Sequence, residues 1–256
     1  MKTITMNNSL FTLALLMISS TVSMSQSIDT LDINHPALVM KNLKPGMKHY
    51  IVYGVDAKGR TVSPWIWRRG VEYTERNGEP VLILKQAWNG PDTSAYRQLY
   101  SIVSAKDFRP IYHYTRSVRG IEAFNFSEKE IKGADTVANN AQKNLTVDVK
   151  TLPYNWELDL EVFQTLPYAM GKQFAISFYH PGGRSAPQHY LYKVIAEETI
   201  NGANEQKIAC WKLKIDYREN SWAIFWISKQ SKEVIKMHED YNGYQRYKVL
   251  LTTAAE

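Results

Sequence analysis

The residues best suited to bind a ligand are tryptophans spaced two apart in β-like runs. Trp65 and Trp67 would share one face of a sheet, and Arg69 would lie on that face too. Trp222 and Trp226 form a second set. Such faces build ordinary cores, but on a curled sheet they can line a concave apolar pocket. The candidate ligand-binding residues are therefore Trp65, Trp67, Arg69, Trp222 and Trp226. We expect Arg69 at the pocket rim, where its guanidinium could meet an acidic head group.

The six histidines show no metal-binding spacing. His180 and His189 flank the loop 181–187, and in a hairpin their imidazoles could face each other as a metal or catalytic pair. The alternative is two ordinary residues at a hairpin base. Two imidazoles without a nearby carboxylate make a poor zinc site, and the single cysteine, Cys210, cannot build a cysteine-rich one. We therefore predict no metal site and no cofactor.

Catalytic residues are not assigned, because no nucleophile motif stands out. Glycoside hydrolysis needs two carboxylates that meet in a cleft. The available carboxylates are Glu72, Glu122, Glu157, Asp159 and Glu161. No spacing singles out a pair, and alternation would put the last three on the solvated face of their segment. A glycan-active enzyme remains the least favoured alternative.

Composition excludes several classes of protein. The 256 residues are 44% hydrophobic and 12% aromatic, with one cysteine, which rules out a disordered chain or a disulfide scaffold. The 31 Lys and Arg exceed the 25 Asp and Glu only mildly. This excess fits a solvated basic face, or contact with anionic lipid or glycan, and together with an export signal it argues against nucleic acid as a partner.

The first 25 residues are typical of a secretory signal peptide. Lys2 is their only charged residue, and the apolar run 10–18 is shorter than the roughly 20 residues that a membrane span needs. The small residues Ser23 and Ser25 predict cleavage before Gln26. No later segment could span a bilayer as a helix. Because of the signal peptide, we expect an exported protein of the periplasm, the outer-membrane surface or the extracellular space.

From Gly46 onward the pattern is β, with alternating runs rich in Tyr, Trp, Val and Ile. The runs expected as strands are 46–55, 61–75, 81–88, 96–104, 110–118 and 120–127, then 172–180, 188–198, 206–217, 222–228, 233–238 and 243–252. The predicted fold is mainly β: an antiparallel sheet of about twelve strands, curled into a barrel or paired half-barrels, with one short helix. The predicted parts are an N-terminal segment (26–45) and a β domain (46–252), itself divided into a first β unit (46–127), a connection with the short helix (128–170) and a second β unit (171–252).

The two β units could be an internal duplication. Asn77-Gly78 pairs with Asn201-Gly202, and Gly120 with Gly243, at nearly the same spacing. Because turn glycines recur in any β protein, the duplication stays open. The alternation over 156–162 would also suit a strand, but Trp156, Leu160 and Phe163 share one helical face, so the helix is expected after Asn155, a good cap, and before Pro167.

Several short motifs resemble a known exported family. They are Asp107-Phe108-Arg109-Pro110 followed by Tyr112, then 159–163 with Leu166-Pro167 and Gly171, and finally 225–227, 234–236, Gly243 and 248–251. These resemble the β-rich family catalogued as domain of unknown function 3108, over roughly residues 100–252. The family's usual Arg after the helix is replaced by Pro167. The resemblance implies an exported antiparallel β fold and no activity.

A looser fold analogy connects such curled sheets to lipoprotein-carrier half-barrels of the LolA and LolB type. The leading functional prediction is therefore an exported envelope protein that binds an apolar or amphipathic ligand, such as lipid, without catalysis. The alternative is an envelope scaffold whose aromatic residues only pack the core. The ligand's identity, protein partners and the oligomeric state are not predicted.

Overall fold

The computed structural model describes residues 28–251, except for 36, 92, 94–95 and 203–204. The predicted signal peptide (1–25) and its cleavage site lie outside the described residues. The N-terminal segment contributes a short edge strand, β1 (Ile28–Leu31), and one 3-10 turn, η1 (Met40–Asn42).

Twelve long strands build most of the described sheet, and along the chain six precede the central helix and six follow it. The first set is β2 (Gly46–Val55), β3 (Thr61–Arg76), β4 (Glu79–Asn89), β5 (Arg97–Ser104), β6 (Pro110–Ser117) and β7 (Gly120–Phe126). The second set is β11 (Gln173–Tyr179), β12 (Gln188–Asn201), β13 (Lys207–Arg218), β14 (Ser221–Ser228), β15 (Val234–Tyr241) and β16 (Tyr244–Leu251). Between them lie the short β8 (Glu130–Gly133), β9 (Thr146–Asp148) and β10 (Tyr154–Asn155). Each expected run coincides with one long strand, and the mainly β prediction is confirmed.

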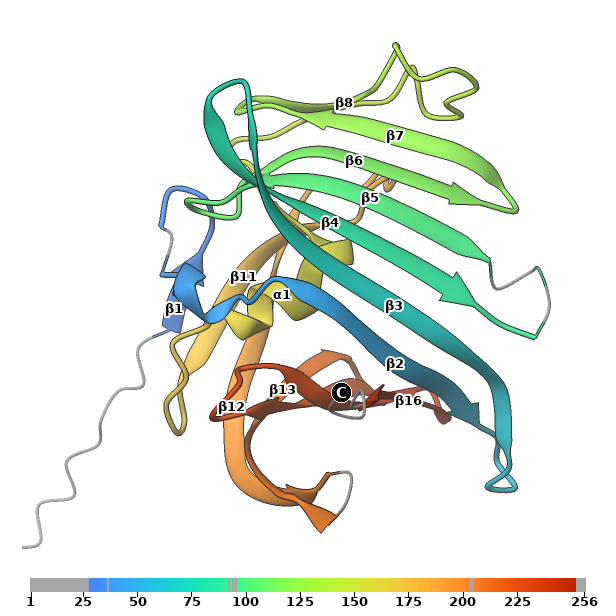
Figure 1. The fold of residues 1–256 in the computed structure, drawn as a ribbon, viewed down its shortest axis with the longest axis vertical. Coiled ribbons are helices and arrows are strands. Elements are labelled where there is room, and N and C mark those ends of the chain that lie inside the picture. The colour runs from blue at the N-terminus through green and yellow to red at the C-terminus, as the bar shows by residue number, and fades with distance from the viewer. Residues whose placement is uncertain (1–27, 36, 92, 94–95, 203–204, 252–256) are drawn as a thin grey trace, which may run out of the picture.

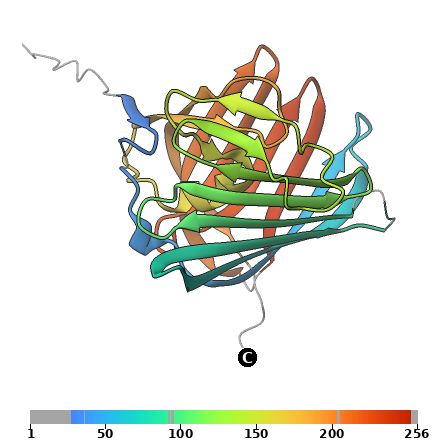
Figure 2. The same ribbon diagram turned by 90° about the horizontal axis from the view of Figure 1, so that it is seen from above.

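All strands belong to one sixteen-stranded sheet. Neighbours are antiparallel except that β1 and β10 pair in parallel with β11. The two sets join where β16 pairs with β2. β1 and β9 end the strand order, so the sheet stays open, and it curls so that the two sets face each other across the helix (Figures 1 and 2). The sheet exceeds the expected strand number because of the four short strands.

The helix lies inside the curl and fills it. It begins as η3 (Trp156–Leu158) and continues as α1 (Asp159–Gln164). The Asn155 side chain accepts a hydrogen bond from the Glu157 N–H at 2.9 Å, as expected of the cap. Phe163 is fully buried, with its ring centroid 4.9 Å from that of Phe225 on β14. The concave side is therefore a packed core around the helix.

Two loops at equivalent places in the two strand sets have the same local geometry. In the β5–β6 loop, Phe108 has a φ of 61° and donates its N–H to the Ser104 carbonyl at 3.0 Å. In the β14–β15 loop, Lys232 has a φ of 66° and donates to the Ser228 carbonyl at the same distance. The sequence separation between these two loops agrees with the separation between the paired turn glycines of the two β units. The two sets therefore share a turn geometry as well as a strand number.

Candidate functional site

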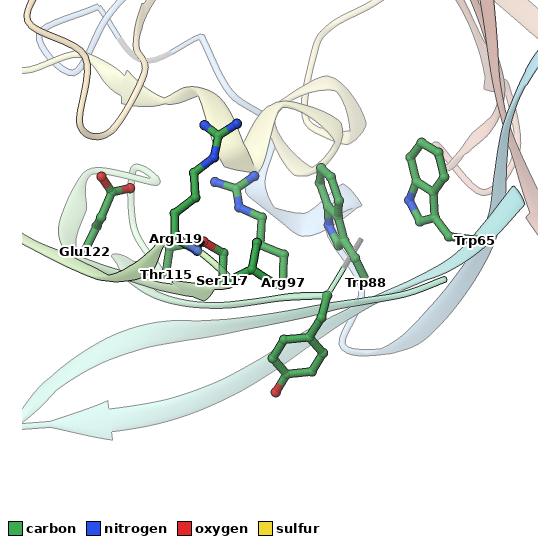
Figure 3. A pocket seen from close by; sticks show the side chains of 9 residues that line it. Trp65, Trp88, Arg97, Thr115, Ser117, Arg119 and Glu122 are labelled. Carbon is green, nitrogen blue, oxygen red and sulfur yellow. Dashed lines mark hydrogen bonds between the residues drawn. The ribbon is translucent and has the colours of Figure 1, made fainter. Parts of the chain in front are cut away.

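An open cleft of about 510 Å³ lies on the concave face beyond the N-terminal end of the helix. One wall is formed by Trp65 of β3 and Trp88 of β4, whose ring centroids lie 6.1 Å apart at an interplanar angle of 24°. In Figure 3 the two indoles stand side by side, with Arg97 and Arg119 beyond Trp88. Glu122 lies at the opposite end of the row. The cleft therefore combines an aromatic wall with charged groups.

The β3–β4 hairpin places the tryptophans. Its two-residue turn, Asn77-Gly78, has positive φ at both positions, which suits a tight hairpin. The turn fixes the register of β3 and β4, in which Trp67 lies opposite Trp88, so the two side chains share one face of the sheet. Trp65 shares that face, so Trp88 contacts both of the other indoles, meeting Trp67 edge-on at 5.5 Å.

Two arginines supply positive charge beside the aromatic wall. Arg97, at the start of β5, makes two hydrogen bonds to the Glu157 carboxylate, at 2.7 and 3.2 Å. Burial would raise the pKa of Glu157, but the Arg97 guanidinium outweighs that effect and lowers it. Arg119, in the β6–β7 turn, is exposed and forms no ion pair with the described residues. Arg97 is thus neutralised, whereas the charge of Arg119 is available.

The other end of the cleft offers hydrogen-bond acceptors. Glu122 of β7 receives a hydrogen bond from the Gln142 side-chain amide at 3.0 Å. Thr115 and Ser117 of β6 line the cleft beside it. The Thr115 hydroxyl already lies 2.9 Å from His113 Nε2, whereas the Ser117 hydroxyl accepts a backbone N–H of the same turn.

The three indole nitrogens of this region differ in their hydrogen bonding. The Nε1 atoms of Trp65 and Trp88 are buried and have no hydrogen-bond partner among the described residues. In contrast, Trp67 donates its indole N–H to Gln86 Oε1 at 3.1 Å. Buried polar groups are normally satisfied, so these two nitrogens are exceptions in the wall, but neither is exposed to the cleft itself.

Arg69 does not lie at the rim, and that expectation is wrong. Its side chain is 2% exposed and forms an ion pair with Glu161 of α1, with one N–H···O bond of 2.9 Å. It also donates to the Glu157 carbonyl at 3.1 Å and to Gln86 Oε1 at 3.2 Å. The guanidinium lies 4.3 Å from the centroid of Trp67. The helix docks directly over this part of β3, so Trp67 and Arg69 belong to the buried helix–sheet junction.

The expectation of solvated carboxylates on the central segment is also wrong. Asp159 and Glu161 are buried, and the Glu157 side chain is 19% exposed. Burial raises the pKa of Asp159, against the opposing effect of the nearby Lys248 and Arg69. These acidic side chains point to the sheet because its concave face offers basic partners.

Trp222 and Trp226 lie on the other face of the sheet. The register aligns Trp65 with Phe225 across β2, β16 and β15, and directly opposed residues share a face. Trp226 therefore points outward, where it donates its indole N–H to Glu198 at 3.1 Å. Lys212 and Lys236 lie 5.0 and 4.9 Å from its ring centroid. The structure does not bring these two tryptophans together with Trp65 and Trp67.

His180 and His189 do not face each other. His180 stacks on Trp156 with centroids 4.3 Å apart, and its Nε2 lies 3.0 Å from the Tyr190 hydroxyl. His189 occupies the position before Tyr190 on β12 and so points to the opposite face. Across the described residues, no cluster of three or more His, Cys, Asp or Glu could hold a metal ion.

The sequence interpretation missed Trp88, Arg97, Arg119 and Glu122. One signal was present for Trp88, because the Asn77-Gly78 turn fixes the register and so predicts its position opposite Trp67. The arginines and Glu122 come from later hairpins, and nothing local connects them to the tryptophans. Only the complete sheet brings them together.

The architecture defines a class of protein: an open, curled antiparallel sheet around a short helix, with a cleft beside the N-terminal end of that helix. A family model described as "Protein of unknown function (DUF3108)" matches residues 49–251, so the chain belongs to this family. The resemblance found in the motifs is confirmed and extends further toward the N-terminus. No curated protein matches the sequence.

Solved structures with a similar outline come from other families. A β-barrel-like protein of the DUF1849 family from Brucella abortus is 14% identical, with 80% of this chain and 96% of that chain covered and a TM-score of 0.44. A DUF1329 family protein from Desulfovibrio piger is 9% identical, with 83% and 87% covered and a TM-score of 0.32. In the described part of this chain, no helix is both long and apolar enough to cross a membrane.

Proposed function

We propose that the protein binds an amphipathic ligand carrying an acidic group, and that the ligand occupies the cleft without undergoing reaction. One observation carries the proposal: the Trp65–Trp88 wall stands beside Arg119, a cation with no acidic partner among the described residues. The indoles would cover the apolar part of the ligand. Arg119 would bind the acidic group through charge-assisted hydrogen bonds.

The packed interior limits how such a ligand can sit. Leu160 and Phe163 fill the curl, so the apolar part would lie along the tryptophan wall at the mouth. A lipid would therefore contact the protein through its head group and the adjoining carbons. This is a shallower mode of binding than a deep apolar pocket inside the curl would allow. An envelope scaffold without a ligand is the competing function.

Export is part of the proposal. It is supported by the apolar run 10–18 and by the small residues Ser23 and Ser25 just before Gln26. N-terminal sequencing of protein recovered from the envelope or medium should start at Gln26. Recovery of the uncleaved chain from the cytoplasm alone would contradict export.

Tryptophan fluorescence provides the binding test. We expect oleate and lysophosphatidylglycerol to change the emission, and Arg119→Gln to weaken their binding about tenfold or more, because it removes a charged donor. Arg68→Gln is the matched control, since Arg68 is exposed and points away from the concave face. No response to either amphiphile, or equal affinity in both variants, would refute this site and favour the scaffold.

A further inference from the structure

The cleft contains one cation and one anion that are not paired with each other. Arg119 of the β6–β7 turn and Glu122 of β7 both line it. Neither forms an ion pair with the described residues, whereas the other charged side chain of the lining, Arg97, is neutralised by Glu157. Arg119 and Glu122 are three positions apart in the chain, so their Cα atoms lie within about 11 Å of each other. A ligand that carries both signs of charge close together would complement both groups.

The Glu122 carboxylate is held in position by its neighbours. One of its oxygens accepts the Gln142 side-chain amide at 3.0 Å. The Gln142 backbone N–H donates in turn to the Asn140 side-chain oxygen at 3.0 Å. Asn140 is buried and hydrogen-bonds both the N–H and the carbonyl of Ala123 on β7, at 3.1 and 2.8 Å. The second carboxylate oxygen, Oε2, has no hydrogen-bond partner among the described residues, so Glu122 presents a fixed and unused acceptor.

The order of the groups along the cleft matches the order of groups in a phospholipid. The strands follow one another from β3 to β7, so the tryptophans, Arg119 and Glu122 lie in a row, as Figure 3 shows. In a phospholipid with an amino head group, the apolar carbons come first, the phosphate second and the amine last. The phosphate would then meet Arg119 and the amine would meet Glu122.

A protonated primary amine suits Glu122 better than a hydroxyl does. Both can donate a hydrogen bond, but the ammonium has three donors and a charge opposite to that of the carboxylate. Hydrogen bonds between two charged groups are roughly twice as strong as those between neutral ones. The acidic group on Arg119 provides binding, and the amine on Glu122 adds a preference among acidic amphiphiles.

We infer that the ligand is a lipid with a zwitterionic head group, a phosphate joined to a primary amine by a short linker, as in phosphatidylethanolamine. The phosphate binds Arg119, the ammonium binds Glu122, and the adjoining carbons cover Trp65 and Trp88. This inference rests on the proposed function and names the head group of its ligand. It makes Glu122 the residue that determines specificity.

The test compares lysophosphatidylethanolamine with lysophosphatidylglycerol of the same acyl chain, below their critical micelle concentrations, by tryptophan fluorescence titration. Both lipids present a phosphate, but only the first carries an amine. We expect the unaltered protein to bind the ethanolamine lipid about tenfold more tightly. Equal affinity, or a preference for the glycerol lipid, would overturn the inference.

Glu122→Gln removes the charge and keeps the shape of the side chain. It should weaken binding of the ethanolamine lipid about tenfold and leave the glycerol lipid unchanged, so the preference disappears. Arg119→Gln should weaken both lipids. Glu72→Gln is the matched control and should change neither, because Glu72 is exposed on the opposite face of β3. A preference that survives Glu122→Gln would overturn the role of Glu122.

The outcomes separate this inference from the proposed function. Free phosphoethanolamine should bind much more weakly than the lipid, because it leaves the tryptophan wall uncovered, and equal affinity would overturn the lipid as its source. If both lipids bind equally well through Arg119, the head-group inference fails and the proposed function stands. If neither lipid binds, both fail. The comparison of the two lipids uses the unaltered protein, so the inference stays testable even if a variant folds poorly.

Discussion

Trp67 and Trp65 lie two residues apart on one strand and on one face, yet their surroundings differ. Under the helix, Trp67 donates to Gln86, and Arg69 is held by the Glu161 carboxylate. Beyond the helix, Trp65 leaves its indole N–H unpartnered among the described residues. The same kinds of residue therefore become packing or candidate binding groups according to whether the helix covers them.

The covered region depends on matched charges. Arg69 is buried with Glu161, and its remaining donors are used by Gln86 and the Glu157 carbonyl. A buried ion pair contributes little net stability when intact, but removing one partner strands a charge. We therefore expect this junction to tolerate change far less than the cleft.

The largest effect is expected from Arg69→Gln. The change leaves the Glu161 carboxylate buried without its cation, so the free energy of unfolding should fall by about 3–5 kcal/mol. Urea unfolding followed by circular dichroism measures it. Arg69→Gln with Glu161→Gln removes the stranded charge and should recover part of the loss. A single variant as stable as the original chain would show that this junction is no more sensitive than the cleft.

His113 should give the covered region a dependence on pH. It is buried, its Nδ1 lies 2.8 Å from the Ser101 hydroxyl, and burial lowers its pKa from 6.5 to about 4. In the unfolded chain the imidazole takes up a proton near its ordinary pKa, whereas in the fold it stays neutral. Stability is therefore present above pH 6.5 and is lost as the pH falls toward 4, by about 3 kcal/mol from this residue.

The contribution of His113 is checked by measuring the free energy of unfolding at several pH values between 6.5 and 4. The variant His113→Gln should be less stable at neutral pH but should lose less stability on acidification than the original chain. Asn155, the helix cap, lies 3.1 Å from the same imidazole, so acid should weaken the helix end as well. Equal slopes in the two proteins would exclude His113 as the source.

The strands were predictable because their signals are local. The run 46–55 alternates along its whole length and is strand β2 with those bounds. The Asn77-Gly78 turn and the Asn155 cap were equally readable. The short strands β8 and β9 were not predicted, since three or four residues carry too little pattern to distinguish them from loop.

The site was less predictable because its groups come from separate hairpins. Arg69 contacts Glu161, and Arg97 contacts Glu157, across sequence separations that no local pattern encodes. Alternation showed that Trp222 and Trp226 share a face, but it could not show which face becomes concave. The direction of curl depends on where the helix docks.

Trp226, on the convex face, should have an effect on stability between those of the buried junction and the open cleft. It is 6% exposed, but its cover consists of Lys212, Lys236 and Glu198 rather than core residues. Trp226→Ala should therefore cost about 2 kcal/mol, less than truncation in a closed core, because flexible side chains can close over the gap. Thermal and urea unfolding measure the loss, with ligand affinity unchanged. Complete unfolding would show that this tryptophan supports the sheet itself.

The smallest effect on stability is expected from Arg119→Gln, which makes in the open cleft the same chemical change that Arg69→Gln makes in the buried junction. Arg119 is exposed in a two-residue turn and pairs with no acidic group among the described residues, so its loss strands no charge. The free energy of unfolding should change by about 0.5 kcal/mol or less, as for ordinary surface residues. Urea unfolding beside the Arg69 variant gives the comparison directly. A loss as large as that of Arg69→Gln would mean that Arg119 supports the fold, and the contrast between a covered junction and an open cleft would then fail.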